Sequence, residues 1–183
     1  MHSRSTKKEN QMSRQYLNER WCVRCGKEDP TPYLRDNWEL FIKHYENHPV
    51  NSVINVVDIG CGNGRNSEFM KKKGFRVISI DMVNDYGIPC IMGRQELPLF
   101  PCTVDVILAN YSLMFLDKNE RNKIISNLKI AARSQCTLMV ELYEAKDSFA
   151  PDKNSMLALQ KTIFDAFGWE KIRYSQGKFI ARK

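Results

Sequence analysis

Residues 54–81 constrain the fold of this 183-residue chain more than any other stretch. The stretch consists of an apolar run (54–60), a turn with Gly60, Gly62 and Gly64, a short helical pattern (65–73) and a second apolar run (75–81) that ends in Asp81. Buried parallel strands are continuous apolar runs, and glycine lets a backbone turn sharply and approach a ligand closely. This order predicts a strand–helix–strand unit that binds a nucleoside.

The glycine spacing narrows the kind of nucleoside. A dinucleotide-binding turn reads G-x-G-x-x-G, whereas this turn has one residue fewer in its last gap and is preceded by Asp58. A negative charge at Asp58 would repel a pyrophosphate and would suit a cationic amino group. Asp81 stands where an acid accepts hydrogen bonds from ribose hydroxyls. The alternative is an ordinary glycine-rich turn in an unrelated α/β protein.

Residues Asp58 to Ser67 resemble motif I of the class I S-adenosylmethionine-dependent methyltransferases, and most of all the tellurite-resistance group and its small-molecule relatives. Ser112 to Leu116 resemble the same group, and the resemblance covers about residues 55–145. It implies S-adenosylmethionine as the cofactor. It also implies a Rossmann-like, doubly wound, mostly parallel sheet with one antiparallel strand near its C-terminal edge.

The resemblance also implies roles for individual residues. Asp58 is expected to bind the ammonium end of the cofactor, directly or through water. Asp81 is expected to bind the ribose hydroxyls, and Met82 to lie against the adenine. Gly60, Gly62 and Asn63 would line the methionine part. Two alternatives stay open: Asp58 caps the glycine turn, and Asp81 is only a surface strand end.

Two further contacts depend on residues that depart from the family pattern. Many relatives carry an aspartate at the position of Gly93, so we expect Arg94 or Gln95 to take over its contact with adenine. Asn110 follows the fourth predicted strand, where the sulfonium should face the substrate. The sequence there, Asn110-Tyr111-Ser112, is not the Asp/Asn-Pro-Pro-Tyr of enzymes that methylate the amino groups of bases.

Methyl transfer mainly requires alignment of the nucleophile and exclusion of water. A base is needed only where the nucleophile carries a proton. The sequence offers no convincing base, and by position the candidates are Tyr111, Glu141 and Tyr143.

The elements predicted elsewhere alternate between strands and helices. Further strands are expected at about 88–92, 104–110 and 136–143, helices at 36–45, 118–132 and 155–167, and a hairpin at 170–175 and 178–182. Only Met82–Gly87 separate the second strand from the third, which is too short for a helical crossover. We therefore expect a minimal fold with reduced helices around the third strand. Residues 1–13 are expected to be a disordered basic tail, and residues 14–183 one domain in which residues 14–48 form a cover or lid.

Composition bounds the remaining possibilities. No apolar stretch reaches the roughly 18 residues that span a membrane, and six cysteines without a signal peptide favour a cytoplasmic protein. Cys22 and Cys25 form a single Cys-x-x-Cys, which His44 and His48 could complete, but we expect no metal site.

The net charge of +7 is concentrated at the two ends of the chain. The motif wording and the missing base-amino signature after the fourth strand lead us to expect a small-molecule acceptor. The basic termini favour the alternative, an RNA (tRNA or rRNA) or protein methyltransferase that uses them. An inactive, cofactor-binding regulatory subunit is the second alternative.

Overall fold

The computed structural model describes residues 29–42, 53–82, 91–92, 97, 99–142 and 153–183. They form a seven-stranded sheet of order β3-β2-β1-β4-β5-β7-β6, in which β7 alone runs against the other strands. The strands are β1 (Asn55–Ile59), β2 (Arg76–Asp81), β3 (Ile91–Met92), β4 (Val104–Asn110), β5 (Ala132–Glu141), β6 (Glu170–Ser175) and β7 (Lys178–Arg182). The expected doubly wound, mostly parallel sheet with a C-terminal hairpin is confirmed.

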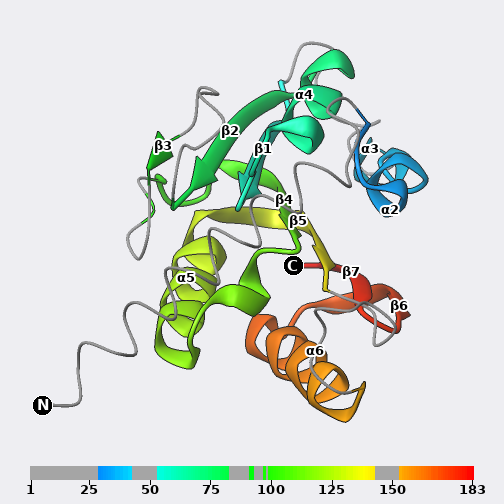
Figure 1. The fold of residues 1–183 in the computed structure, drawn as a ribbon. Coiled ribbons are helices and arrows are strands. Elements are labelled where there is room, and N and C mark those ends of the chain that lie inside the picture. The colour runs from blue at the N-terminus through cyan, green and yellow to red at the C-terminus, as the bar shows by residue number, and fades with distance from the viewer. Residues whose placement is uncertain (1–28, 43–52, 83–90, 93–96, 98, 143–152) are drawn as a thin grey trace, which may run out of the picture.

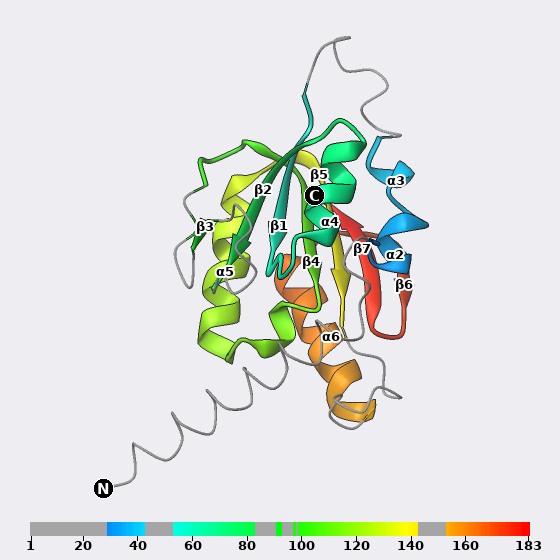
Figure 2. The same ribbon diagram turned by 45° about the horizontal axis from the view of Figure 1, so that its top comes forward.

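Helices cover both faces of the sheet. They are α2 (Pro32–Arg35), α3 (Glu39–Ile42), α4 (Arg65–Lys72), α5 (Lys118–Ala131) and α6 (Lys153–Phe167), with a 3-10 turn at Leu113–Phe115. Helices α5 and α6 lie on one face, and α2, α3 and α4 lie on the other (Figures 1 and 2). Within the described part of the chain, no helix has the length and apolarity needed to cross a membrane.

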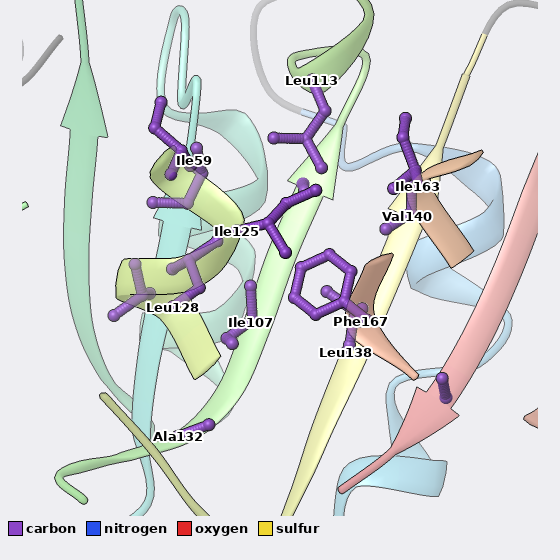
Figure 3. Packing of buried hydrophobic residues seen from close by; sticks show 14 of the residues in the cluster. Ile59, Ile107, Leu113, Ile125, Leu128, Ala132, Leu138, Val140, Ile163 and Phe167 are labelled. Atoms are coloured by element: carbon purple, nitrogen blue, oxygen red, sulfur yellow. The ribbon is translucent and has the colours of Figure 1, made fainter. Parts of the chain in front are cut away.

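Two apolar layers follow from the alternation of side chains along the strands. Ile107 of β4 and Leu138 of β5 belong to the layer under α5 and α6, with Phe167 packed among them (Figure 3). Their neighbours Leu108 and Met139 belong to the opposite layer, under α2 and α4. Both faces of β4 and β5 are therefore buried, which explains why these strands are nearly continuous apolar runs.

The N-terminal helices differ from the single helix expected at 36–45. Helix α2 begins at Pro32, four residues before the expected start, and α3 follows after a turn. The expected start was wrong because proline suits the first helical position, where its missing N–H would have no partner. Thr31 caps the helix by accepting a hydrogen bond from the backbone N–H of Leu34 at 3.4 Å.

The described part of the expected cover, residues 29–42, packs on the face that carries α4. Leu34 and Phe41 are fully buried there, together with Val106, Met139 and Ile180 of β4, β5 and β7. Residues 29–42 therefore cover the middle and the C-terminal half of the sheet. Their movement as a lid stays a prediction.

Strand β5 begins at Ala132, four residues earlier than expected. Its pairing with β4 shifts register between Val104, opposite Ala132, and Val106, opposite Thr137, so β5 bulges over its first residues. These residues are polar, and Gln135 has a φ of 68°, which hides the strand from a search for apolar runs. At the third strand, Ile91–Met92 pair with β2 in parallel, and residues 88–90 lie outside the described residues.

The start of α5 offers a first test of the fold. The Asp117 carboxylate accepts hydrogen bonds from the N–H groups of Asn119 (2.8 Å) and Glu120 (2.9 Å), and the Glu120 side chain accepts one from the Asp117 N–H. Replacing Asp117 by alanine is expected to lower the free energy of unfolding by about 0.5–2 kcal/mol. Urea denaturation checks this value, and the serine variant, which retains a capping oxygen, should lose less.

Candidate functional site

The glycine turn lies at the carboxyl end of β1, between β2 and β4. The N–H groups of Gly60 and Cys61 donate to the Ile80 carbonyl of β2 at 2.8 and 3.2 Å. Gly60 has a φ of 69°, and a Cβ placed on it would lie 2.3 Å from the Cβ of Ser112. Only glycine fits at this position, because both the backbone conformation and the contact with the loop after β4 exclude a side chain.

Asp81 ties the end of β2 to the same turn. Its Oδ2 accepts a hydrogen bond from the Gly62 N–H at 2.8 Å, and its Oδ1 accepts one from the Met82 N–H at 2.7 Å. A Cβ on Gly62 would meet no described atom within 4 Å. The turn therefore has an open side next to the Asp81 carboxylate.

Asp58 is buried and faces the first turn of α4. Its Oδ2 accepts a hydrogen bond from the Ser67 hydroxyl at 2.7 Å, and that hydroxyl lies 2.8 Å from the hydroxyl of Ser79. Burial raises the pKa of Asp58 to about 6, and the charge of Asp81 adds to the rise, while the hydrogen bonds from Ser67 oppose it. In this structure Asp58 is bonded to the helix that follows the glycine turn, through Ser67.

This environment predicts how the stability depends on pH. The pKa of Asp58 is higher in the folded protein than its ordinary value of 3.8, so its contribution to stability is complete below that value and is lost as the pH rises through about 6. We compare the free energy of unfolding of Asp58→Asn with that of the wild type at each pH. The difference should favour the variant by about 1–3 kcal/mol more at pH 7.5 than at pH 4. Urea denaturation of both proteins at the two pH values measures this difference. An equal difference at both pH values would contradict it.

A second polar cluster joins the N-terminal segment to the carboxyl ends of β4 and β5. The Thr31 hydroxyl donates a short hydrogen bond to Oε1 of Glu141, and the Tyr111 hydroxyl donates to Oε2 at 3.2 Å. The Asn110 amide donates to the Thr31 hydroxyl at 3.2 Å, and the Thr31 N–H donates to the side-chain oxygen of Asn66 at 2.9 Å. Three of the predicted site residues therefore meet in one network, which we call the Glu141 cluster (Thr31, Asn110, Tyr111 and Glu141).

The Glu141 cluster is buried and constrained. Glu141 has no exposed surface, and burial raises its pKa, while the hydrogen bonds from Thr31 and Tyr111 and the charges of Lys178 and Arg65 lower it. Tyr111 adopts a left-handed φ of 57°, an unusual conformation for a bulky residue, and its N–H donates to the Glu141 carbonyl at 2.7 Å.

Two polar atoms in and beside this cluster lack partners among the described residues. They are the side-chain oxygen of Asn110, a residue that is 7% exposed, and the hydroxyl of Ser112. Unpaired buried polar atoms are uncommon, and they often indicate a missing ligand or water. The cluster can therefore still accept hydrogen bonds from a molecule at this end of the sheet.

The remaining predicted residues are dispersed. Asn63 accepts a weak 3.4 Å hydrogen bond from the Arg65 N–H, and Met82 packs against the core at the end of β2. Arg94, Gln95 and Tyr143 lie outside the described residues, as do the cysteine and histidine pairs considered for zinc. Over the described ranges, no group of three or more His, Cys, Asp and Glu side chains is placed to hold a metal.

Thr31, Ser67 and Ser112 are the site residues that the sequence reasoning missed. Ser67 belongs to the quoted motif and Thr31 precedes a proline, which is a helix-start signal. Neither pattern shows what the side chain contacts.

Comparisons with known proteins agree with this geometry. Residues 25–97 match the model of the family described as "Tellurite resistance protein TehB". No curated protein sequence matches the chain. Solved structures with the same fold include a SAM-dependent methyltransferase from Aquifex aeolicus, at 17% identity and a TM-score of 0.61, with 84% of this chain and 93% of that chain covered.

Two other solved structures share the fold. One is the 1,6-didemethyltoxoflavin-N1-methyltransferase of Burkholderia thailandensis, at 16% identity and a TM-score of 0.61, covering 83% of this chain and 78% of that one. The other is the N-methyltransferase NodS of Bradyrhizobium japonicum WM9, at 14% identity and a TM-score of 0.55, covering 84% and 88%. Both were crystallised with S-adenosylhomocysteine. At these identities the likeness establishes the fold.

Proposed function

We propose that the chain is a class I S-adenosylmethionine-dependent methyltransferase related to the tellurite-resistance group and that it methylates a small-molecule acceptor. The observation that carries this proposal is the pairing of Asp81 with the open side of the glycine turn. The pair lies at the carboxyl ends of β1 and β2, beside the point where the strand order reverses, and open α/β sheets bind their ligands there.

The residues present fit the cofactor. The Asp81 carboxylate would accept hydrogen bonds from the ribose hydroxyls, and Met82 offers an apolar surface for adenine. The open side of Gly62 leaves room for the methionine part next to backbone N–H groups. Asp58 would act indirectly, by fixing the first turn of α4, because its oxygen is already bonded to Ser67. We keep Asn63, Arg94, Gln95 and Asn110 as expected contacts.

When bound, S-adenosylmethionine supplies an electrophilic methyl group, so the protein must position the acceptor and exclude water. Residues 29–42 contribute to both tasks in this proposal. Thr31 hydrogen-bonds to Glu141 at the end of β5, and Leu34 packs in the apolar layer on the face of the sheet that carries α4. Tyr111 and Glu141 stay the described candidates for a catalytic base, and Tyr143 is the third.

The small-molecule acceptor rests on two supports. The quoted motifs resemble the small-molecule group, and a structural neighbour acts on a small heterocycle, 1,6-didemethyltoxoflavin. A cytoplasmic location, expected from the six cysteines, belongs to the same proposal.

Replacing Asp81 by alanine tests the cofactor site. The variant should bind S-adenosylhomocysteine more weakly by about 1–3 kcal/mol, because the ribose hydroxyls and the Gly62 N–H lose their acceptor. Titration calorimetry measures the change. Replacing Asp165 of α6, an exposed carboxylate distant in sequence from the glycine turn, by alanine is the matched control. Equal affinity of the wild type and Asp81→Ala would refute the ribose assignment.

A further inference from the structure

We propose that Thr31, Asn110 and Glu141 form the methyl-acceptor subsite and that this subsite selects an amine as the nucleophile. The proposal rests on the proposed function and adds the chemical class of the acceptor. It also places a residue of the N-terminal segment, Thr31, among those that build the site.

The location is fixed by the sheet. Asn110 and Glu141 are the last residues of β4 and β5, and they pair directly in the parallel register. Two residues after Asn110, Ser112 touches the glycine turn so closely that Gly60 has no room for a side chain. The Glu141 cluster therefore lies next to the turn that is assigned to the cofactor, on the side away from Asp81 and β2.

The chemistry of the cluster follows from its hydrogen-bond inventory. The single hydroxyl proton of Thr31 is donated to Glu141, so Thr31 has no further proton to offer a ligand. The side-chain oxygen of Asn110 is a buried acceptor with no partner among the described residues. An unpaired buried acceptor carries a desolvation penalty that a ligand N–H or O–H would remove.

Charge distinguishes an amine from the other possible donors. Burial raises the pKa of Glu141, and the charges of Lys178, opposite Glu141 on β7, and Arg65, at the start of α4, oppose this rise and favour the carboxylate form. A carboxylate beside the carbonyl oxygen of Asn110 attracts an ammonium group. The same two groups disfavour an anionic substrate, because neither of them can donate a hydrogen bond to it. An alcohol would satisfy Asn110 but would gain nothing from the charge.

An amine also needs a proton acceptor, and Glu141 can serve as one. An ammonium nitrogen has no lone pair, so it first gives a proton to a carboxylate oxygen of Glu141. The neutral amine then attacks the methyl group of the cofactor: the N–C bond forms, the S–C bond breaks with its electron pair left on sulfur, and the product is the N-methylated ammonium ion. Burial makes this carboxylate more basic than an ordinary glutamate, which suits the role. The hydroxyl of Tyr111, a half-buried residue, donates to Oε2, and in this proposal it is the route by which the proton leaves Glu141.

Thr31 acts here as a positioning residue. Its hydroxyl holds Oε1 of Glu141 and accepts from Asn110, while its N–H is held by Asn66 of α4. Removing the hydroxyl should raise the pKa of Glu141, because a hydrogen bond to the charged form is lost. A serine retains that hydrogen bond, whereas a valine of nearly the same shape does not.

The experiment uses the full chain and radiolabelled S-adenosylmethionine. The acceptors are a panel of primary amines, each paired with the alcohol of the same skeleton, such as benzylamine with benzyl alcohol, and tellurite as an oxyanion. We expect methylation of one or more amines, with their alcohols and tellurite at least tenfold poorer. Glu141→Gln should lower kcat/KM for the amine by about 100-fold or more, while the affinity for S-adenosylhomocysteine changes less than about threefold. Glu170→Gln, an exposed glutamate on β6, is the control and should match the wild type.

A second readout does not depend on turnover. In protein labelled with ¹³C-glutamate, the carboxyl signal absent from Glu141→Gln reports the titration of Glu141. Its midpoint should move to higher pH in Thr31→Val and return in Thr31→Ser, and kcat/KM should follow the same order. An unmoved midpoint, preferred transfer to alcohols or tellurite, or no transfer to any amine while S-adenosylhomocysteine binds would overturn the proposal. Failure of the wild type to bind S-adenosylhomocysteine would instead refute the proposed function.

Discussion

Replacing Gly60 by alanine is expected to destabilise the protein by about 2–5 kcal/mol and to eliminate cofactor binding. Two independent costs combine. A residue with a Cβ pays about 1–2 kcal/mol for a left-handed conformation such as the φ of 69° at Gly60. Forcing an atom to 2.3 Å from the Ser112 Cβ adds about 1–3 kcal/mol of overpacking. Because Ser112 follows β4, the strain should displace the loop that carries Asn110 and Tyr111.

Gly62→Ala is the matched control. Gly62 has a similar φ of 52°, but a Cβ there would meet nothing within 4 Å in the described structure. This variant should pay the conformational cost alone, about 1–2 kcal/mol. Urea denaturation gives both free energies of unfolding, for which Gly62→Ala is the control, and calorimetry with S-adenosylhomocysteine gives the binding of Gly60→Ala. Equal losses in the two variants would show that the contact with Ser112 is unimportant.

Removal of residues 1–34 is expected to abolish cofactor binding and to lower the free energy of unfolding by several kcal/mol. The deletion removes Leu34, which is fully buried, and loss of a buried leucine side chain costs about 2–5 kcal/mol. It also removes Thr31, which leaves the buried polar groups of Glu141 and Asn66 without their partner, at about 1–3 kcal/mol each.

The shorter deletion of residues 1–12 is the comparison, and it should leave both properties nearly unchanged. Thermal melting with and without S-adenosylhomocysteine measures stability and binding together. A soluble 35–183 fragment that binds the ligand as the full chain does would show that the N-terminal segment is dispensable, and the cover would then have no role in the site.

The fold was largely predictable because the signals that set it are local. The predicted bounds of β4, β6 and β7 agree with the structure, since each strand is delimited by turn residues, as at Gln176-Gly177 in the hairpin. The start of β5 was missed because its bulged residues are polar. The break between α2 and α3 depends on tertiary packing of Leu34 and Phe41, which residue periodicity does not encode.

The site was predictable only in part. Gly60 and Asp81 follow from their spacing, since each is required by a backbone turn or a strand end. The contact of Asp58 with Ser67 depends on which way a carboxylate turns inside the fold. Thr31 and Glu141 are 110 residues apart, and only the docking of α2 on the sheet brings them together. No local pattern predicts such a pair.

Titration calorimetry of the full chain with S-adenosylhomocysteine, and in parallel with NAD⁺ and NADH, tests the central claim most directly. We expect saturable one-to-one binding of S-adenosylhomocysteine, weakened by about 1–3 kcal/mol in Asp81→Ala, and no binding of either dinucleotide. Binding of a dinucleotide without binding of S-adenosylhomocysteine would contradict the assignment of the glycine turn and with it the proposed function.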